Sequence, residues 1–452
     1  MIFKRYISEG LAHYSYLIAD QGQAAIIDPK RDIDDYLCDA ANEGCHIDNV
    51  LETHRNEDYL IGSLELNAAT GAELFHADSQ WDYQYGNAVR EGQVWQIGRL
   101  KIEAIHTPGH TPGSMSYLLS DPEGNPWMIF TGDLLFSGDV GRMDLLGEDR
   151  LSEMAGLLYD SLFNKVLPLG DSIIVCPAHG MGSVCGAEIS ERTWTTIGLE
   201  KQHNPKLKVG SKEEFIAKHA KMLERPPYFR KMERLNLEGP PVLGRLPVLR
   251  PLQPAAFAEA ARSAQVLDTR GQVSFAAAHV PDSLSIWAAR LSNYAGWFLN
   301  DDKPVLFVCD PSDTGKISRK MIRLGFDNLA GYLEGGIVGW TKAGMSFKSI
   351  DLLTMTEFCD LMKSDTKKVL LDIRGEDELK GGGLQHGKHL HLTQMPGNLA
   401  DLPVNLPIIP LCTSGNRSMI AASILRKAGW EDVRVPVGGL GAWRAFDCDF
   451  EL

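Results

Sequence analysis

An internal repeat in the C-terminal half limits the fold of this chain more than any other sequence feature. Each copy spans roughly 100 residues, which is too long for a solenoid repeat and fits a small domain. The first copy contains VLDTRG at 266–271, PVLFVC at 304–309 and GGIVGW at 335–340. The second contains LLDIRG at 370–375, PIIPLC at 407–412 and GGLGAW at 438–443. Three landmarks in the same order predict two tandem domains, each with alternating strands and helices around a parallel sheet.

The remaining sequence predicts one further domain. A chain of 452 residues is too long for a single core. Prolines at 226–227 and 240–241 mark a connection between domains. We therefore expect domains at residues 1–245, with connecting helices at its end, at 250–348 and at 353–452.

Charge and composition exclude several classes of partner. The net charge of -14 argues against nucleic acid and anionic membranes as partners. No apolar run approaches the ~20 residues needed to span a bilayer, and the polar N-terminus predicts a cytoplasmic protein. The eight cysteines form no CxxC pair, so we expect reduced thiols rather than a disulfide scaffold.

Four polar motifs follow strand-sized apolar runs in the first domain. They are THRNEDY at 53–59, HTPGHTPGS at 106–114, TGDLLF at 131–136 and CPAHG at 176–180. A single histidine is usually a hydrogen-bonded or surface residue. Four strand ends that offer histidine or aspartate in one domain predict a metal site, because borderline divalent metals select these ligands.

These motifs resemble those of the metallo-β-lactamase superfamily, which implies an αββα sandwich. The superfamily's first motif is normally THxHxDH. This chain keeps His54 and Asp58 but has Asn56 and Tyr59 at the positions of two histidines. A dinuclear zinc hydrolase needs those histidines, so the departure predicts that a two-metal site is not formed.

Within that superfamily the sequence is similar to persulfide dioxygenases. The resemblance implies one Fe(2+) per chain, with zinc as an alternative metal, held by His54, His110 and Asp133. Two histidines and one carboxylate are the facial triad of non-haem iron oxygenases. The resemblance also implies that Arg142 binds a substrate carboxylate, here of a glutathione-type carrier. Residues that surround the metal ligands are then Asn56, Asp58, Tyr59 and His179.

The last domain contains a candidate nucleophile, Cys412, between an apolar strand and a stretch with helical spacing. A cysteine at such a loop meets backbone N–H groups and a helix N-terminus, which stabilise a thiolate or persulfide anion. The motif CTSGNRS resembles the rhodanese loop CxxGxR. This resemblance implies catalysis by Cys412 and Arg417 through ping-pong transfer of a sulfane sulfur. The substrate then contacts the rest of the loop: Thr413, Ser414, Gly415, Asn416 and Ser418.

The first copy of the repeat has a different cysteine segment. Cys309 is followed by DPSDTG, which lacks the arginine and adds two acidic residues. Counting back from the helix end places Cys309 one residue out of register with Cys412. Negative neighbours raise a thiol pKa. We therefore expect a non-catalytic rhodanese-like domain at 250–348.

The resemblances together imply a persulfide dioxygenase fused to tandem rhodanese domains. Such an enzyme uses dioxygen and a thiol persulfide of the glutathione or coenzyme A type, and makes or consumes sulfite and thiosulfate. Family members commonly self-associate, which implies a homo-oligomer. Three alternatives stay open. The chain could be a sulfurtransferase with a scaffold metal domain, a zinc thioester hydrolase of the glyoxalase II type, or a persulfide carrier that docks another protein.

Overall fold

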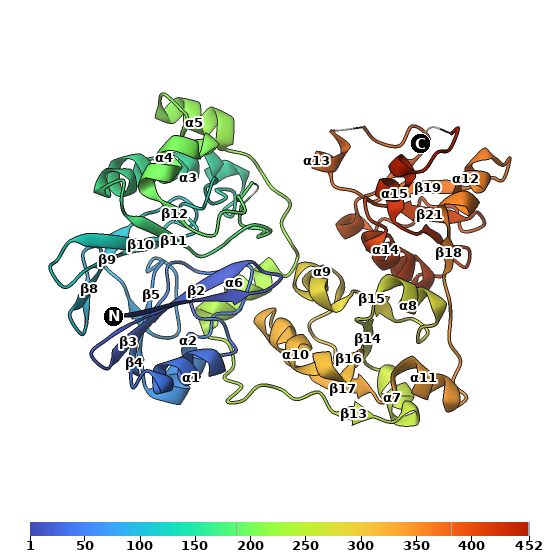
Figure 1. Cartoon of the computed structure of the whole chain (residues 1–452), viewed down its shortest axis with the longest axis horizontal. Helices are drawn as coiled ribbons and strands as arrows, with labels where there is room; N and C mark the ends of the chain where they lie inside the picture. The colour runs from blue at the N-terminus through green and yellow to red at the C-terminus, as the bar shows by residue number, and fades with distance from the viewer. Residues whose placement is uncertain (187, 381, 451–452) are drawn as a thin grey trace. The chain divides into compact units, whose positions relative to one another are not determined.

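The computed structural model describes residues 1–186, 188–380 and 382–450. The chain divides into two compact units (Figure 1). The first comprises Met1–Leu246 and Arg319–Gly325, and the second comprises Pro247–Ser318 and Phe326–Leu452. Among the described residues, no helix combines the length and the apolar character that crossing a bilayer requires.

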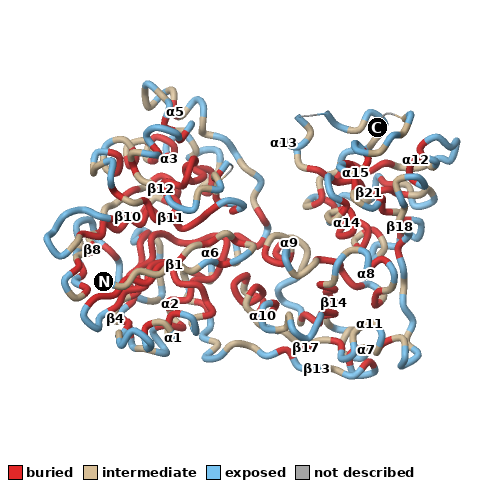
Figure 2. Tube along the Cα trace, viewed as in Figure 1, coloured by how far each residue is buried: buried red, intermediate tan, exposed pale blue. Residues whose placement is uncertain are grey.

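Two six-stranded sheets form the centre of the first unit. The first sheet has the order β1 (Ile2–Ser8), β2 (His13–Asp20), β3 (Gln23–Ile27), β4 (His46–Leu51), β5 (Glu73–His76), β6 (Asn87–Ala88). The second has the order β12 (Thr195–Thr196), β11 (Ile174–Pro177), β10 (Pro126–Gly132), β9 (Met115–Ser120), β8 (Leu100–His106), β7 (Val94–Ile97). Buried side chains from both sheets, such as Tyr16, Ile27, Tyr117 and Phe130, form one core cluster. The two sheets therefore pack face to face (Figure 2).

Helices cover the outer face of each sheet. The helices of this unit are α1 (Asp34–Asn42), α2 (Ser63–Thr70), α3 (Glu148–Asp160), α4 (Ile197–His203), α5 (Lys212–His219) and α6 (Phe229–Glu238). Tyr36 of α1 and Leu66 of α2 pack on the first sheet. Leu158 of α3 and Phe215 of α5 pack on the second sheet. The expected αββα sandwich is confirmed, because each sheet buries one face on the other sheet and one on helices.

The second unit contains the two copies of the repeat. The first copy has a five-stranded parallel sheet with the order β13 (Pro251–Leu252), β17 (Leu329–Leu333), β16 (Val305–Val308), β14 (Gln265–Asp268), β15 (Leu284–Ser285). In the second copy, β18 (Asp351–Leu353) pairs with β22 (Arg434–Pro436). There β20 (Lys388–His389), β19 (Val369–Asp372) and β21 (Ile408–Leu411) form a parallel group, which a bridge from Ile408 to Val433 joins to β22. The strand orders correspond, which confirms the tandem parallel-sheet domains.

The helices of the second unit flank these sheets. They are α7 (Pro254–Ala261), α8 (Gln272–Ala277), α9 (Leu291–Phe298), α11 (Gly336–Lys342), α12 (Met355–Lys363), α13 (Glu376–Leu379), α14 (Asn416–Lys427) and α15 (Gly439–Ala445). One more helix, α10 (Thr314–Arg323), begins in this unit, and its residues from Arg319 onward belong to the first unit. Residues 451–452, at the end of the predicted 353–452 domain, lie outside the described residues.

The expectation that all cysteines are thiols is wrong for one pair. Cys359 of α12 and Cys448 form a disulfide, with a Cα–Cα distance of 6.1 Å. They are 89 residues apart in the sequence, and only the packing of the C-terminal segment against α12 brings them together. Spacing along the chain carries no signal for such a contact.

Candidate metal centre and cysteine loop

Strand ends from both sheets bring the predicted ligands together. His54 lies in the loop after β4, His110 in the loop after β8, and Asp133 directly follows β10. Asp133 Oδ2 lies 3.8 Å from His54 Nε2 and 3.5 Å from His110 Nε2. All three side chains are buried. These atoms make no hydrogen bond within the part of the chain that the structure describes. Three buried polar atoms that face one another in this way fit a shared cation.

Hydrogen bonds fix the orientation of His54. The Thr53 hydroxyl donates to Asp28 Oδ2 at 2.7 Å and lies 2.9 Å from His54 Nδ1. Because the hydroxyl has one proton and gives it to Asp28, His54 donates from Nδ1, and its lone pair is on Nε2. Burial raises the pKa of Asp28 to about 6, so this carboxylate is still ionised at neutral pH. Gly132 is needed here, because its φ is +53° and a Cβ would lie 2.6 Å from Thr53 Oγ1.

His110 is oriented by the backbone of Arg142. Its Nδ1 donates to the Arg142 carbonyl oxygen at 2.8 Å, which again leaves the Nε2 lone pair toward the centre. The Arg142 side chain makes two bonds to Asp144, at 2.7 and 2.8 Å. Arg142 therefore contributes its carbonyl to the centre, while its guanidinium is held by an internal carboxylate. Binding of a substrate carboxylate by this side chain stays a prediction, and it requires displacement of Asp144.

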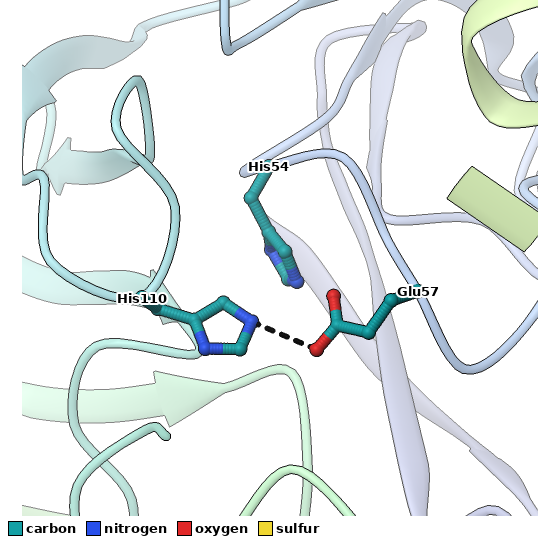
Figure 3. Close-up of side chains that lie close together, drawn as sticks. All are labelled: His54, Glu57 and His110. Carbon is teal, nitrogen blue, oxygen red and sulfur yellow. Dashed lines mark ion pairs between the residues drawn. The ribbon is translucent and has the colours of Figure 1, made fainter. Parts of the chain in front are cut away.

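Glu57 also belongs to this centre, and the sequence reasoning missed it. Its Oε1 lies 3.1 Å from His110 Nε2 (Figure 3). His54, Glu57 and His110 place one ligand atom each within 4.8 Å of the others. Burial opposes the shift, but the Glu57 carboxylate raises the pKa of His110 to about 9. Without a metal, the carboxylates thus hold a proton on a histidine. The sequence does contain a signal for Glu57, because this carboxylate lies within the motif that contains His54 and Asp58.

The four surrounding residues of the sequence prediction are all buried near the centre. His179 follows β11 and donates from Nδ1 to Asp133 Oδ1 at 2.7 Å, and its Nε2 lies 3.0 Å from Asp58 Oδ2. Asn56 donates from its side chain to the His54 carbonyl oxygen at 3.3 Å. The Tyr59 ring packs against the ring of His13, with 4.0 Å between ring centroids and a tilt of 36° between the ring planes. Asn56 and Tyr59 therefore take structural contacts at the positions where the superfamily motif has histidines.

The cysteine loop of the second repeat copy is held around the sulfur of Cys412. The Gly415 N–H donates to Cys412 Sγ at 3.1 Å, and the Ser418 hydroxyl donates to it at 3.3 Å. Gly415 has a φ of +81° and precedes the first residue of α14, Asn416. A thiolate or persulfide at Cys412 therefore meets N–H and O–H donors and a helix N-terminus. Thr413 and Ser414 are exposed beside it, where a substrate can reach them.

Glu378 of α13 is a second residue that the sequence reasoning missed. The Arg417 guanidinium forms a two-pronged ion pair with this carboxylate, at 2.5 and 2.7 Å. The Thr413 hydroxyl donates to the same carboxylate at 2.9 Å. Glu378 thus occupies the donors that Arg417 would offer to an anionic sulfur compound.

The register predicted for Cys309 is wrong. Asp268 pairs with Val308 in the first copy, and Asp372 pairs with Leu411 in the second. Cys309 and Cys412 each follow these strand ends directly, so they hold equivalent positions, and the length difference lies beyond them. The predicted electrostatic effect is confirmed. Burial is the largest cause that raises the pKa of Cys309 to about 12, and the charges of Asp313, Asp268 and Asp310 add to it.

Family comparisons agree with this organisation. The metallo-beta-lactamase superfamily model matches residues 9–179, and the rhodanese-like domain model matches residues 254–343 and 354–446. Persulfide dioxygenase ETHE1 of Bos taurus is 28% identical over 50% of this chain and 78% of its own length. Hydroxyacylglutathione hydrolase GloC of Haemophilus influenzae is 27% identical over 41% of this chain and 88% of its own length.

Solved structures cover both units. A metallo-beta-lactamase from Staphylococcus aureus is 28% identical with a TM-score of 0.66, over 74% of this chain and 98% of its own. ETHE1 from Myxococcus xanthus is 32% identical over 54% of this chain and all of its own, with a TM-score of 0.46. The chain thus contains a metallo-beta-lactamase superfamily domain followed by two rhodanese-like domains, and its first domain is similar to ETHE1 persulfide dioxygenases.

Proposed function

We propose that this protein oxidises a thiol persulfide to sulfite at a single iron and transfers sulfane sulfur through Cys412. The observation that carries the first activity is the convergence of His54 Nε2, His110 Nε2 and Asp133 Oδ2 in a buried space. Two histidines and a carboxylate leave coordination positions open for substrate and dioxygen. The similarity to the persulfide dioxygenases ETHE1 of Bos taurus and Mus musculus supports the same activity.

The residues of the first unit hold and shield this centre. His54, His110 and Asp133 would bind the iron, which when bound supplies the redox chemistry for dioxygen. Asp28 and Thr53 keep His54 in one tautomer, and the Arg142 carbonyl does the same for His110. Burial of all three ligands excludes water from the reacting groups.

Cys412 carries the second activity. Its thiolate attacks the outer sulfur of thiosulfate, a new S–S bond forms, and sulfite leaves with the electron pair of the broken bond. The product is a Cys412 persulfide anion, which the Gly415 N–H and the Ser418 hydroxyl stabilise. The reverse reaction consumes sulfite from the iron centre. Fusion of the two activities raises the local concentration of the shared compound.

Oxygen uptake tests the dioxygenase directly. Anaerobically purified, iron-loaded protein receives glutathione persulfide, and sulfite is measured with oxygen. We expect uptake with sulfite formation, and loss of both, together with bound iron, in His110→Ala. His106→Ala is the matched control, because His106 lies in the same motif but bonds to the Pro112 carbonyl oxygen instead. Iron binding without uptake would exclude the dioxygenase and leave a sulfurtransferase.

The hydrolase alternative has specific support in the similarity to a hydroxyacylglutathione hydrolase. It requires hydrolysis of an acylated thiol by zinc-loaded protein. The absence of histidine at Asn56 and Tyr59 disfavours it. The identity of the thiol carrier, the cytoplasmic location and self-association stay predictions.

A further inference from the structure

One pair of cysteines in the last domain is crosslinked, whereas the other six cysteines of the chain are free thiols. Cys359 lies on α12 and is 6% exposed, and Cys448 lies after α15 and is partly exposed. Thiol–disulfide exchange begins with the attack of a thiolate on a sulfur that it can reach. The partial exposure of Cys448 therefore leaves this crosslink open to exchange with small thiols.

The crosslink ties the C-terminal segment, residues 446–450, to α12. This segment forms no helix or strand. Its two phenylalanines are partly buried against a core cluster that includes Cys359 of α12 and Trp443 of α15. The ring of Trp443 also meets the ring of Phe358 edge to face, with 4.9 Å between the centroids. Without the crosslink, apolar contacts of partly exposed rings hold the segment against α12.

The other end of α15 holds the cysteine loop. The Leu440 N–H donates to the Cys412 carbonyl oxygen at 2.9 Å, and the Gly441 N–H donates to the Thr413 carbonyl oxygen at 2.7 Å. Gly439 lets the two backbones touch, because its φ is +57° and a Cβ there would lie 2.3 Å from the Cys412 carbonyl oxygen. A helix of seven residues moves as one rigid element, so a displacement of its C-terminal end shifts these bonds to the loop.

We propose that Cys359 and Cys448 form a redox site that controls sulfur transfer at Cys412, an inference that rests on the proposed transfer activity. The crosslinked form fixes α15 at both ends and holds the loop in the geometry that places the Gly415 N–H on Cys412 Sγ. Reduction frees the C-terminal segment, and α15 and the loop then fluctuate around that geometry. The thiol–disulfide balance of the surroundings thereby sets the rate of sulfur transfer.

The chemistry is thiol–disulfide exchange with a low-molecular-weight thiol. A thiolate attacks Cys448 Sγ and forms a mixed disulfide, while Cys359 Sγ leaves with the electron pair of the broken bond and takes up a proton. A second thiolate attacks the sulfur of the small molecule in the mixed disulfide, which releases Cys448 as a thiol and a small-molecule disulfide. Two small thiols are thus oxidised as the crosslink takes up two electrons. The small-molecule disulfide reverses the sequence.

Sulfur transfer before and after reduction tests the proposal. The full-length protein is reduced with dithiothreitol, the reductant is removed by anaerobic gel filtration, and transfer from thiosulfate to cyanide is measured. Because misplacement of a reacting group by ~1 Å costs up to ~100-fold in rate, we expect kcat to fall by roughly ten-fold. Oxidised glutathione should restore kcat, and thiol labelling should show that Cys359 and Cys448 become free on reduction and are crosslinked again on oxidation.

Two variants and a control assign the effect. Cys359→Ser and Cys448→Ser should each show the low kcat of the reduced protein and no response to reductant. Cys38→Ser, which removes an exposed thiol, should respond as the unmodified protein does. Amide hydrogen exchange separates local loosening from unfolding, because reduction should speed exchange at Leu440 and Gly441 and leave the strands of the same domain protected.

Several results would overturn the proposal. One is an unchanged kcat after complete reduction of the crosslink, and another is a response to reductant that persists in Cys448→Ser. Exchange that rises equally across the whole domain would also overturn it, because a general loss of stability then explains the fall in kcat. Absence of sulfur transfer in the crosslinked protein would be a different outcome, which refutes the proposed transfer activity and its control together.

Discussion

Replacement of Glu378 by glutamine should strengthen the binding of anionic sulfur donors at the cysteine loop. In the structure this carboxylate holds the Arg417 guanidinium through two hydrogen bonds and also accepts from Thr413. An anion such as thiosulfate must therefore compete with Glu378 for Arg417. Glutamine has nearly the same shape and keeps a hydrogen-bonding oxygen, so the change removes the charge while the loop keeps its form.

The size of this effect follows from the exposure of the ion pair. The side chains of Arg417 and Glu378 are 22% and 36% exposed, so solvent screens the pair. Exposed pairs contribute about 0.2–1 kcal/mol. Since 1.36 kcal/mol is a factor of ten, we expect the KM for thiosulfate to fall by up to about five-fold, with kcat unchanged.

The pKa of Glu378 determines how the expected change in KM depends on pH. The hydrogen bonds and charge of Arg417 lower the pKa of Glu378 from 4.5 to about 2. A lowered carboxyl pKa means that the pair is complete above the ordinary pKa and is lost as pH falls toward about 2. The ratio of KM values between the two proteins should therefore stay constant across neutral pH.

Steady-state sulfur transfer from thiosulfate to a thiol acceptor measures the prediction. Glu376→Gln is the matched control, because Glu376 lies on the same short helix, is exposed and carries the same charge. A KM that is unchanged, or that falls equally in the control, would refute competition at Arg417. A loss of kcat in a folded protein would show instead that Glu378 positions Arg417.

Three further predictions concern the second unit. Cys412→Ser should abolish sulfur transfer and leave oxygen uptake intact, whereas Cys309→Ser should leave sulfur transfer unchanged. Sulfur transfer that persists without Cys412 would contradict its role as the nucleophile. Asp372→Asn should lower the free energy of unfolding by about 3–5 kcal/mol because it leaves Arg374 buried without its carboxylate. Denaturant titration measures this free energy. The control is Asp432→Asn, which removes the carboxylate of an exposed ion pair and should lower the free energy of unfolding by less than about 1 kcal/mol. Equal losses of stability in the two variants would refute the argument from burial. Reduction of the disulfide between α12 and the C-terminal segment should lower that free energy by about 2–4 kcal/mol, and an unchanged midpoint under reductant would show that the crosslink contributes nothing.

Local sequence patterns were sufficient for the fold and for the main groups of the site. Strands in the core of a sandwich are apolar, and the loops that follow them carry polar groups, so short apolar runs followed by His54, His110 or Asp133 could be recognised directly. The same reasoning found Cys412, because a strand, a tight loop with Gly415 and a helix form one continuous segment. Such features depend on neighbours in the sequence, which is why sequence reasoning could reach them.

Only the tertiary structure showed what lies opposite these groups. Glu57 faces His110, and Glu378 faces Arg417, although the two residues of each pair are far apart in the sequence. Cys185 follows a strand of the second sheet but lies beside Asp58, which follows a strand of the first sheet. The disulfide partner of Cys359 and the internal partner of the Arg142 side chain were hidden for the same reason. The sequence by itself determined which strand ends carry chemistry, because that information is local. The partners of those groups depend on how the two sheets of the first unit pack together and on how the C-terminal segment packs against α12. The spacing of residues along the chain carries no information about such packing.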